Sequence, residues 1–135
     1  MRLQGKVVAV TGASSGMGRA ISLLFAKEGA SVVAMARRKE RLEEIEGLAE
    51  RQGNGKILAF PGDVTDKEDI HQMLETAVKK LGRLDVLINN AGIMDQMMPV
   101  TEVDDELWEK VLAVNLTGPF YACRKAVQMM LEQGG

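Results

Sequence analysis

The segment TGASSGMG places Gly12, Gly16 and Gly18 between an apolar run and a stretch with helical spacing. Because glycine has no Cβ, backbone N–H groups at the start of the helix can approach an anion such as a pyrophosphate closely. Each favourable contact of an anion with a helix terminus contributes about 0.3 to 1 kcal/mol, so several donors must act together. The segment therefore predicts a phosphate-binding loop, and the alternative interpretation is a tight strand-to-helix turn.

Polar residues also follow two later apolar runs and interrupt the last helical stretch. Asp63 and Val64 come after KILAFP, and the segment NNAG, residues 89–92, comes at the end of LDVLIN. Pro119 has no N–H, so the carbonyl of Asn115, four residues earlier, loses its helical partner and is free to accept from water. The alternatives are a solvated residue before a helix for Asp63, an ordinary turn for NNAG and a polar residue at a helix irregularity for Asn115.

The elements that position these residues follow from the hydrophobic pattern. Short runs rich in β-branched residues alternate with stretches whose apolar residues are three and four apart, which is typical of βαβ units. Thr65 and Glu68 have the spacing of a capping box, which predicts the start of the third helix there. We expect strands over residues 6–11, 31–36, 56–61 and 84–89 and helices over 16–28, 40–52, 67–82 and 104–132, the last one interrupted near Gly118-Pro119.

These elements predict one α/β domain over residues 1–135, with a doubly wound parallel sheet. Right-handed crossovers place the first two helices on one face and the later ones on the other, which gives the strand order 3-2-1-4. Ligands of such sheets bind outside the carboxyl ends of the strands, where the strand order reverses. This point lies between the first and fourth strands, and the segments TGASSGMG and NNAG meet there.

Composition narrows the classes of function. Hydrophobic residues make up 46% and charged residues 27%, and the formal net charge is −2. These values predict a packed core and exclude a broad positive field for nucleic acid or an anionic membrane. Cys123 is the one cysteine and His71 the one histidine, so neither an internal disulfide nor a Cys/His metal cluster is expected. No apolar run approaches a membrane span, and the interpretation is a soluble, cytoplasmic protein.

The motifs resemble those of one family when they are taken in register. Thr11-Gly12-x-x-x-Gly16-x-Gly18, Asp63-Val64, NNAG and Asn115 in VNLTG have the order and spacing of the short-chain dehydrogenase/reductase family. The resemblance covers essentially the whole chain. It implies a Rossmann-type fold and NAD(P)-dependent hydride transfer between nicotinamide C4 and a small-molecule carbonyl or alcohol. It also implies a homo-oligomer, because the family commonly forms dimers and tetramers through its later helices.

The resemblance also implies a role for each motif residue. Asp63 and Val64 would hold the adenine, and Asn115 would bind, through its backbone carbonyl, a water of the proton relay. Asn89 is expected to tie Thr11 to the fourth strand. The residues that would contact the cofactor phosphates and the adjacent ribose are Gly12, Ser14, Gly16, Met17 and Gly18, and those beside the nicotinamide ribose are Asn90, Ala91 and Gly92.

Charge at the end of the second strand indicates which cofactor is preferred. Folds that select NAD place an acidic residue there to bind the ribose 2′-OH. In this chain Ala36 occupies that position and is followed by Arg37 and Arg38. A guanidinium contact with a 2′-phosphate contributes roughly 1.5 to 3 kcal/mol, so we expect NADP(H) to be favoured over NAD(H). Against this, Ser15 stands where some NADP(H)-preferring relatives carry a basic residue, and RRKER would also suit a solvated helix start.

The residues that perform the family's chemistry are not all found in this chain. That chemistry needs a serine, a tyrosine and a lysine four residues after the tyrosine. Tyr121 and Lys125 have this spacing, but we reject them because they follow Asn115 too soon. We expect the amino-terminal part of a longer enzyme, ending before a fifth strand, that binds the dinucleotide without turnover. The alternatives are a non-catalytic dinucleotide-binding module, such as a redox sensor, and a flavodoxin-like regulatory domain, which would not explain NNAG and VNLTG.

Overall fold

Parallel strands pair in the order β3-β2-β1-β4 in the computed structural model, which describes residues 1–135. Val8 of β1 lies opposite Val32 of β2 and Val86 of β4, so the first strand is central. The strands are β1 Val7–Thr11, β2 Ser31–Ala36, β3 Lys56–Pro61 and β4 Val86–Ile88. The predicted fold class and strand order are confirmed.

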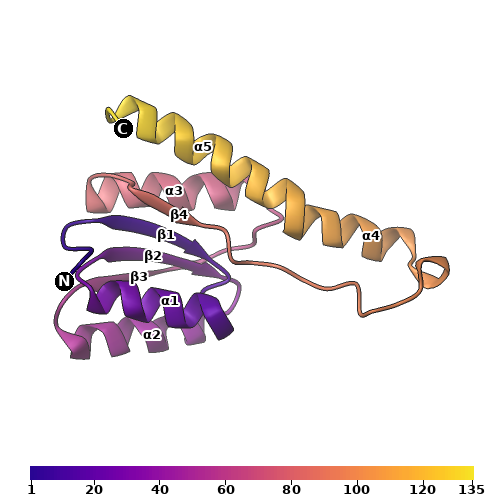
Figure 1. Cartoon of the computed structure of the whole chain (residues 1–135), viewed down its shortest axis with the longest axis horizontal. Helices are drawn as coiled ribbons and strands as arrows, with labels where there is room; N and C mark the ends of the chain where they lie inside the picture. Colours follow the sequence, from indigo (N-terminus) through magenta and orange to yellow (C-terminus); the bar gives the residue numbers. More distant parts are fainter.

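Helices cover both faces of this sheet, with α1 and α2 on one face and α3 and α5 on the other (Figure 1). The long helical stretch that contains α4 and α5 extends past the carboxyl end of the sheet. The bounds are α1 Gly16–Lys27, α2 Lys39–Gln52, α3 Lys67–Leu81, η1 Val100–Glu102, α4 Asp105–Leu112, η2 Ala113–Thr117 and α5 Gly118–Glu132. No helix is long and apolar enough to cross a membrane.

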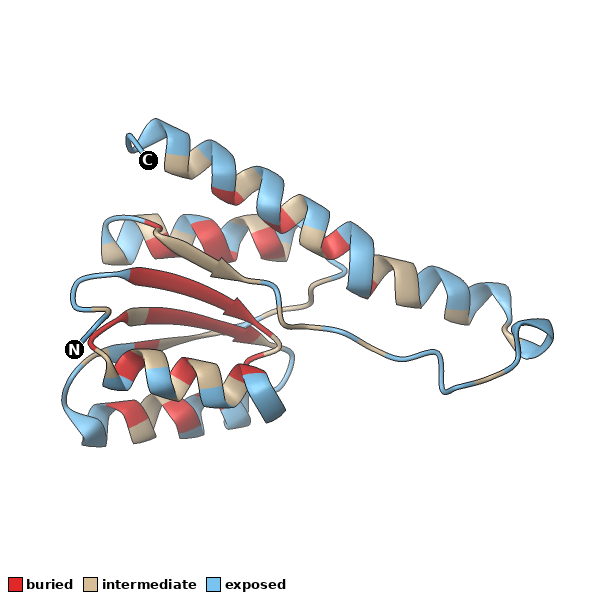
Figure 2. Cartoon of the chain, viewed as in Figure 1, coloured by how far each residue is buried: buried red, intermediate tan, exposed pale blue.

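The core consists of two apolar clusters, one on each side of the sheet. Val8 and Val32 belong to the same cluster as Ile45 of α2, whereas Val33 shares the other cluster with Leu74 of α3. Successive strand residues point to opposite faces, and a strand that is buried on both faces needs a continuous apolar run. Figure 2 accordingly shows β1 and β2 buried almost throughout, while the helices are buried only along their inner sides. This rigid layer fixes where the strands end.

Glycines cap the ends of α2 and α3. Gly53 follows α2 and Gly82 follows α3, with φ values of 76° and 91°, and both adopt the left-handed conformation that glycine tolerates. The start of α3 differs from the prediction. Asp66 is the N-cap, and its carboxylate accepts from the N–H of Glu68 at 2.9 Å. The predicted capping box at Thr65 is wrong because the Thr65 hydroxyl donates to Asp63 Oδ1 at 2.8 Å instead.

The fourth strand is shorter than predicted and begins at Val86, although the N–H of Asp85 still donates to the carbonyl of Val7 at 2.9 Å. Leu84 exchanges two hydrogen bonds with the side chain of Gln133, at 3.0 and 2.7 Å, beyond the end of α5. The Asp85 carboxylate accepts from the N–H of Val7 at 2.9 Å. These bonds anchor the entry to β4 without extending the ladder.

The predicted interruption of the last helical stretch is confirmed and takes the form of a π-helical segment. This segment, η2, connects α4 to α5, and Pro119 lies in the first turn of α5. Gly118 begins α5 directly beside the loop after β3, since a Cβ at residue 118 would lie 2.6 Å from the carbonyl oxygen of Val64. Any larger residue there would have to push this loop away.

Candidate functional site

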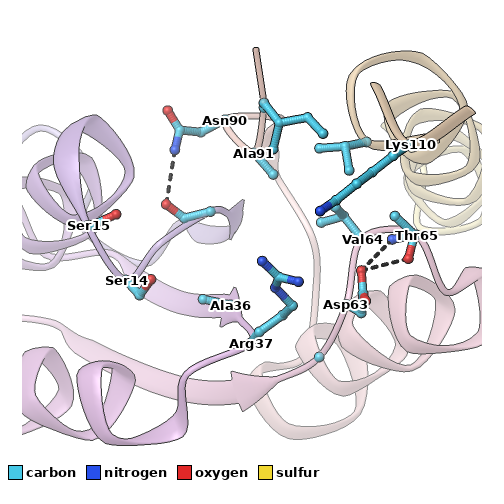
Figure 3. A pocket seen from close by; sticks show the side chains of 15 residues that line it. Ser14, Ser15, Ala36, Arg37, Asp63, Val64, Thr65, Asn90, Ala91 and Lys110 are labelled. Carbon is cyan, nitrogen blue, oxygen red and sulfur yellow. Dashed lines mark hydrogen bonds between the residues drawn. The ribbon is translucent and has the colours of Figure 1, made fainter. Parts of the chain in front are cut away.

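The loops that follow all the strands of the sheet line one cavity of about 410 Å³ at its carboxyl edge (Figure 3). Residues from α4 and η2 complete the wall. The lining residues are Gly12, Ser14, Ser15, Ala36, Arg37, Gly62, Asp63, Val64, Thr65, Asn90, Ala91, Gly92, Ile93, Lys110 and Val114. The cavity lies at the predicted position, beside the point where the strand order reverses.

The loop after β1 touches the loop after β4, and glycines make this approach possible. Gly12 has a φ of 64°, and a Cβ there would lie 2.9 Å from the Cα of Ala91. A Cβ at Gly18, in α1, would lie 2.1 Å from the Gly12 carbonyl oxygen and 2.5 Å from Nδ2 of Asn90. Real Cβ atoms do not come this close to other heavy atoms, so these positions require glycine.

Hydrogen bonds hold the same two loops together. The buried hydroxyl of Thr11 accepts from the N–H groups of Asn90 and Ala91, at 3.2 and 3.1 Å. In return, the side-chain amide of Asn90 donates to the carbonyl of Gly12 at 3.0 Å. The prediction that Asn89 ties Thr11 to the fourth strand is therefore wrong. The side chain of Asn89 donates instead to Sγ of Cys123, on α5, at 3.2 Å.

The first turn of α1 has backbone donors without side-chain acceptors. Ser15 is the N-cap residue, its hydroxyl makes no capping bond, and the first turn contains no acidic residue. The N-terminus of a helix carries a partial positive charge and several N–H groups without partners. Ser14 and Ser15 both line the cavity beside this terminus. This end of the cavity is therefore suited to an anionic group such as a diphosphate.

The opposite end of the cavity contains a carboxylate and two cations. The N–H of Thr65 donates to Asp63 at 2.9 Å, and this bond is the main reason that the pKa of Asp63 lies below its usual range. Burial opposes this shift, while the Thr65 hydroxyl and the charges of Arg37 and Lys110 lower the pKa further. Asp63 is thus an ionised acceptor at neutral pH, and it loses that property only as the pH falls through its lowered pKa.

The structure brings most of the predicted site residues together. Those that line the cavity are Gly12, Ser14, Arg37, Asp63, Val64, Asn90, Ala91 and Gly92. Gly18 supports the wall from behind, whereas Met17 is 76% exposed. Gly16, Met17 and Arg38 do not line the cavity, so their contact with a ligand stays a prediction.

Asn115 lies outside the main cavity, in an adjoining hollow that it shares with Gly92 and Met94. Its side-chain oxygen accepts from the N–H of Ile93 at 2.8 Å, and its side-chain nitrogen donates to the Ile93 carbonyl at 2.7 Å. The side chain therefore holds the chain that leaves the NNAG segment. The water-binding role of its backbone carbonyl stays a prediction.

Sequence reasoning missed the contribution of α4 and η2. Lys110 and Val114 line the cavity, although no motif marks them. Their spacing of four residues places them on one helical face, which was the available signal. Gly62, Thr65 and Ile93 were missed as well, and each of them directly adjoins a residue that was predicted.

Comparison with known proteins matches this chain to one family. The model of the family described as short chain dehydrogenase matches residues 6–135. A short chain dehydrogenase/reductase of Gibberella zeae is 44% identical over 97% of this chain and 48% of its own length. The 3-oxoacyl-[acyl-carrier-protein] reductase of Thermotoga maritima is 44% identical over 98% of this chain and 53% of its own length.

A solved structure is also similar to this chain. A metagenomic short-chain oxidoreductase in complex with NADP superposes with a TM-score of 0.92 at 32% identity, over 98% of this chain and 60% of that one. The chain spans about half the length of the two curated relatives described above.

A pair of glycine substitutions tests the contact between the two loops. Gly18→Ala should lower the free energy of unfolding by about 1 to 3 kcal/mol, because its Cβ would meet the Gly12 carbonyl. Gly47→Ala, also within a helix, has its nearest neighbour at 3.7 Å and should raise the free energy of unfolding by about 0.5 to 1 kcal/mol. Urea unfolding of the unaltered chain and of both variants measures these free energies. If Gly18→Ala stabilises the chain as much as Gly47→Ala does, the close contact at Gly18 is contradicted.

Proposed function

Because the chain belongs to the short-chain dehydrogenase family, we propose that it forms the dinucleotide-binding part of an oxidoreductase. The reaction is transfer of a hydride between nicotinamide C4 and the carbonyl or alcohol carbon of a small-molecule substrate. One observation carries the proposal. The loops after all the strands line a single cavity, with N–H donors of a helix at one end and an ionised Asp63 at the other.

The residues that line the cavity fit each part of a nicotinamide dinucleotide, which supplies the hydride when it is bound. Gly12, Ser14 and the start of α1 would bind the phosphates, because no side chain carboxylate competes there. Asp63 would accept from the adenine amine, and the backbone of Val64 would complete that contact. Asn90, Ala91 and Gly92 would lie along the nicotinamide ribose. The bonds that Asn90 and Ala91 donate to Thr11 and Gly12 hold this segment in place.

The cavity also supports a preference for NADP(H) over NAD(H). Ala36 and Arg37 both line it, so no carboxylate at the end of β2 is available to bind a ribose 2′-OH. The guanidinium of Arg37 points into the cavity (Figure 3). A charge-assisted contact with a 2′-phosphate contributes roughly 1.5 to 3 kcal/mol, which corresponds to a preference of about tenfold to a hundredfold.

The positions of Tyr121 and Lys125 support the view that these 135 residues bind the dinucleotide without turning over substrate. Tyr121 packs against the core on the α3 side, with Nζ of Lys67 at 5.3 Å from its ring centroid. Lys125 pairs with Glu75 on α3 at 3.3 Å. Neither residue lines the cavity, so the general acid/base of the family has no equivalent beside it.

Exposed apolar side chains on α5 and η2 support self-association. Leu116, Phe120, Val127 and Leu131 are 52% to 73% exposed, and their spacing places them along one helical face. An apolar stripe along one helical face is typical of a protein interface. We therefore propose a homo-oligomer that pairs through this stripe.

We also propose a cytoplasmic location, since Cys123 is a free, exposed thiol. A fluorescent fusion found only in an oxidising compartment would contradict this location.

Titration of the chain with NADPH tests the proposed function. Saturable binding is expected from the rise of nicotinamide fluorescence, and an assay with a ketone should detect no oxidation of the cofactor. Gly47→Ala lies outside the cavity and should bind NADPH as the unaltered chain does. Absence of saturable binding would contradict the proposed function, and ketone-dependent oxidation would contradict the proposed lack of turnover.

Cofactor preference is tested by reversing one charge. Arg37→Asp should abolish the preference for NADPH over NADH, a change of about tenfold to a hundredfold in the affinity ratio. Arg51→Asp makes the same change in charge in the last turn of α2, outside the cavity, and should largely preserve the ratio. Calorimetric titration with both cofactors measures it. An unaltered ratio in Arg37→Asp would show that this arginine does not select the cofactor.

Self-association is tested by placing a charge in the apolar stripe. Val127→Glu should weaken oligomerisation about tenfold or more, because an unpaired charge is costly to bury. Leu24→Glu introduces the same charge at an exposed apolar residue outside the stripe, on α1, and should leave the oligomer intact. Light scattering across a concentration series distinguishes the two. An unaltered chain that stays monomeric throughout would refute the proposed oligomer.

A further inference from the structure

Charged side chains occupy only one end of the cavity. The wall contains Arg37, Asp63 and Lys110, and every other lining residue is uncharged. The end formed by the glycine loop and the end formed by the NNAG segment therefore bind through backbone and small polar groups. The charged end has a net charge of +1, from two cations and one carboxylate. This asymmetry is not needed to bind a diphosphate, for which the start of α1 already provides donors.

The two cations of this end form no ion pair within the protein. None of the ion pairs in the structure involves Arg37 or Lys110, although Asp63 lies on the same wall. One carboxylate oxygen, Oδ1 of Asp63, accepts from the N–H and the hydroxyl of Thr65, at 2.9 and 2.8 Å, and the two cations act on this carboxylate only through their charge. Figure 3 shows both cationic side chains directed into the cavity from different walls, Arg37 from the loop after β2 and Lys110 from α4. Their charge is thus available to a ligand.

On the basis of the proposed function, we propose that Lys110 is a specificity-determining residue that acts with Arg37 to select an adenosine ligand carrying a phosphate on its ribose. Asp63 and Val64 mark the end of the cavity that would hold adenosine. A ribose phosphate would be the ligand's only anionic group near this end, because the diphosphate binds at the start of α1. Two cations from separate elements would then both stabilise it, and the loss of either would weaken binding.

The solvent exposure of Lys110 determines how much it is expected to contribute to the affinity for the phosphate. Lys110 is exposed to solvent, so its attraction for a phosphate acts through a high effective dielectric and is screened by salt. Such an interaction corresponds to about threefold to tenfold in affinity, less than the direct contact expected of Arg37. The contribution should shrink as the ionic strength rises, which a purely apolar or steric role would not do.

A matched pair of ligands isolates the ribose phosphate. Adenosine 2′,5′-bisphosphate and 5′-AMP differ only in the 2′-phosphate, and both can be titrated calorimetrically into the 135-residue chain. In Lys110→Met, the affinity for the bisphosphate should fall about threefold to tenfold, and the affinity for 5′-AMP should change less than twofold. Lys110→Arg, which keeps the charge, should restore the ratio of the two affinities. Lys80→Met removes an equal charge from the end of α3, far from the wall, and should leave that ratio unaltered.

The outcomes separate this inference from the proposed function. An unaltered ratio in Lys110→Met, including an equal loss for both ligands, overturns the specificity role, since Lys110 would then have no effect or contact adenine alone. The same change of ratio in Lys80→Met also overturns it, because only the net charge of the chain would matter. If the unaltered chain binds neither ligand and no NADPH, the proposed function itself fails. The inference is supported if the ratio of the bisphosphate affinity to the 5′-AMP affinity falls only in Lys110→Met and if this fall becomes smaller at high salt.

Discussion

The cavity depends on the close contact between the loops that follow β1 and β4. These strands are neighbours in the sheet but lie about 80 residues apart in the chain, as the Thr11 to Ala91 bond shows. The sheet order alone brings their ends near each other, and the Thr11 hydroxyl sets the distance by accepting two N–H bonds. Gly12 and Gly18 leave no side chains in the gap, so the backbone itself forms the wall. The loop after β1 and the NNAG segment therefore form one structural unit.

The π-helical segment connects this unit to the loop after β3. One extra residue in a helical turn rotates all following side chains by roughly 100°, since an α-helix has about 3.6 residues per turn. Asn115 lies within the segment and brackets Ile93, while Gly118, just after it, lies against the carbonyl of Val64. An uninterrupted α-helix would turn at least one of these residues away. The π-helical segment before Pro119 thus positions two walls of the cavity, at Ile93 and at Val64.

The sequence predicted the parts of this architecture that depend on long patterns. The buried run SVVAMA predicted both ends of β2 correctly, and the handedness of the crossovers predicted the strand order. It failed where two nearby groups compete for one partner. Thr65 and Asp66 can both cap α3, and Asn89 and Asn90 both adjoin Thr11; only the folded geometry decides between them. Lys110 was missed because it reaches the cavity through tertiary packing of α4, which no local motif records.

One end of the cavity is formed by backbone groups and the other by exposed charged side chains. This difference decides which end can be altered by mutation without loss of the fold. At the start of α1, the proposed binding would depend on backbone N–H groups and on glycines that tolerate no Cβ, so a change there would disturb the contact between the loops after β1 and β4. At the other end, Arg37 and Lys110 are exposed side chains with no internal partner. Exposed residues of this kind change stability by only about 0.5 kcal/mol when they are replaced. If the proposed function holds, the affinity for phosphates would be fixed by the fold, while the choice between ligands would be set by side chains that the fold does not need.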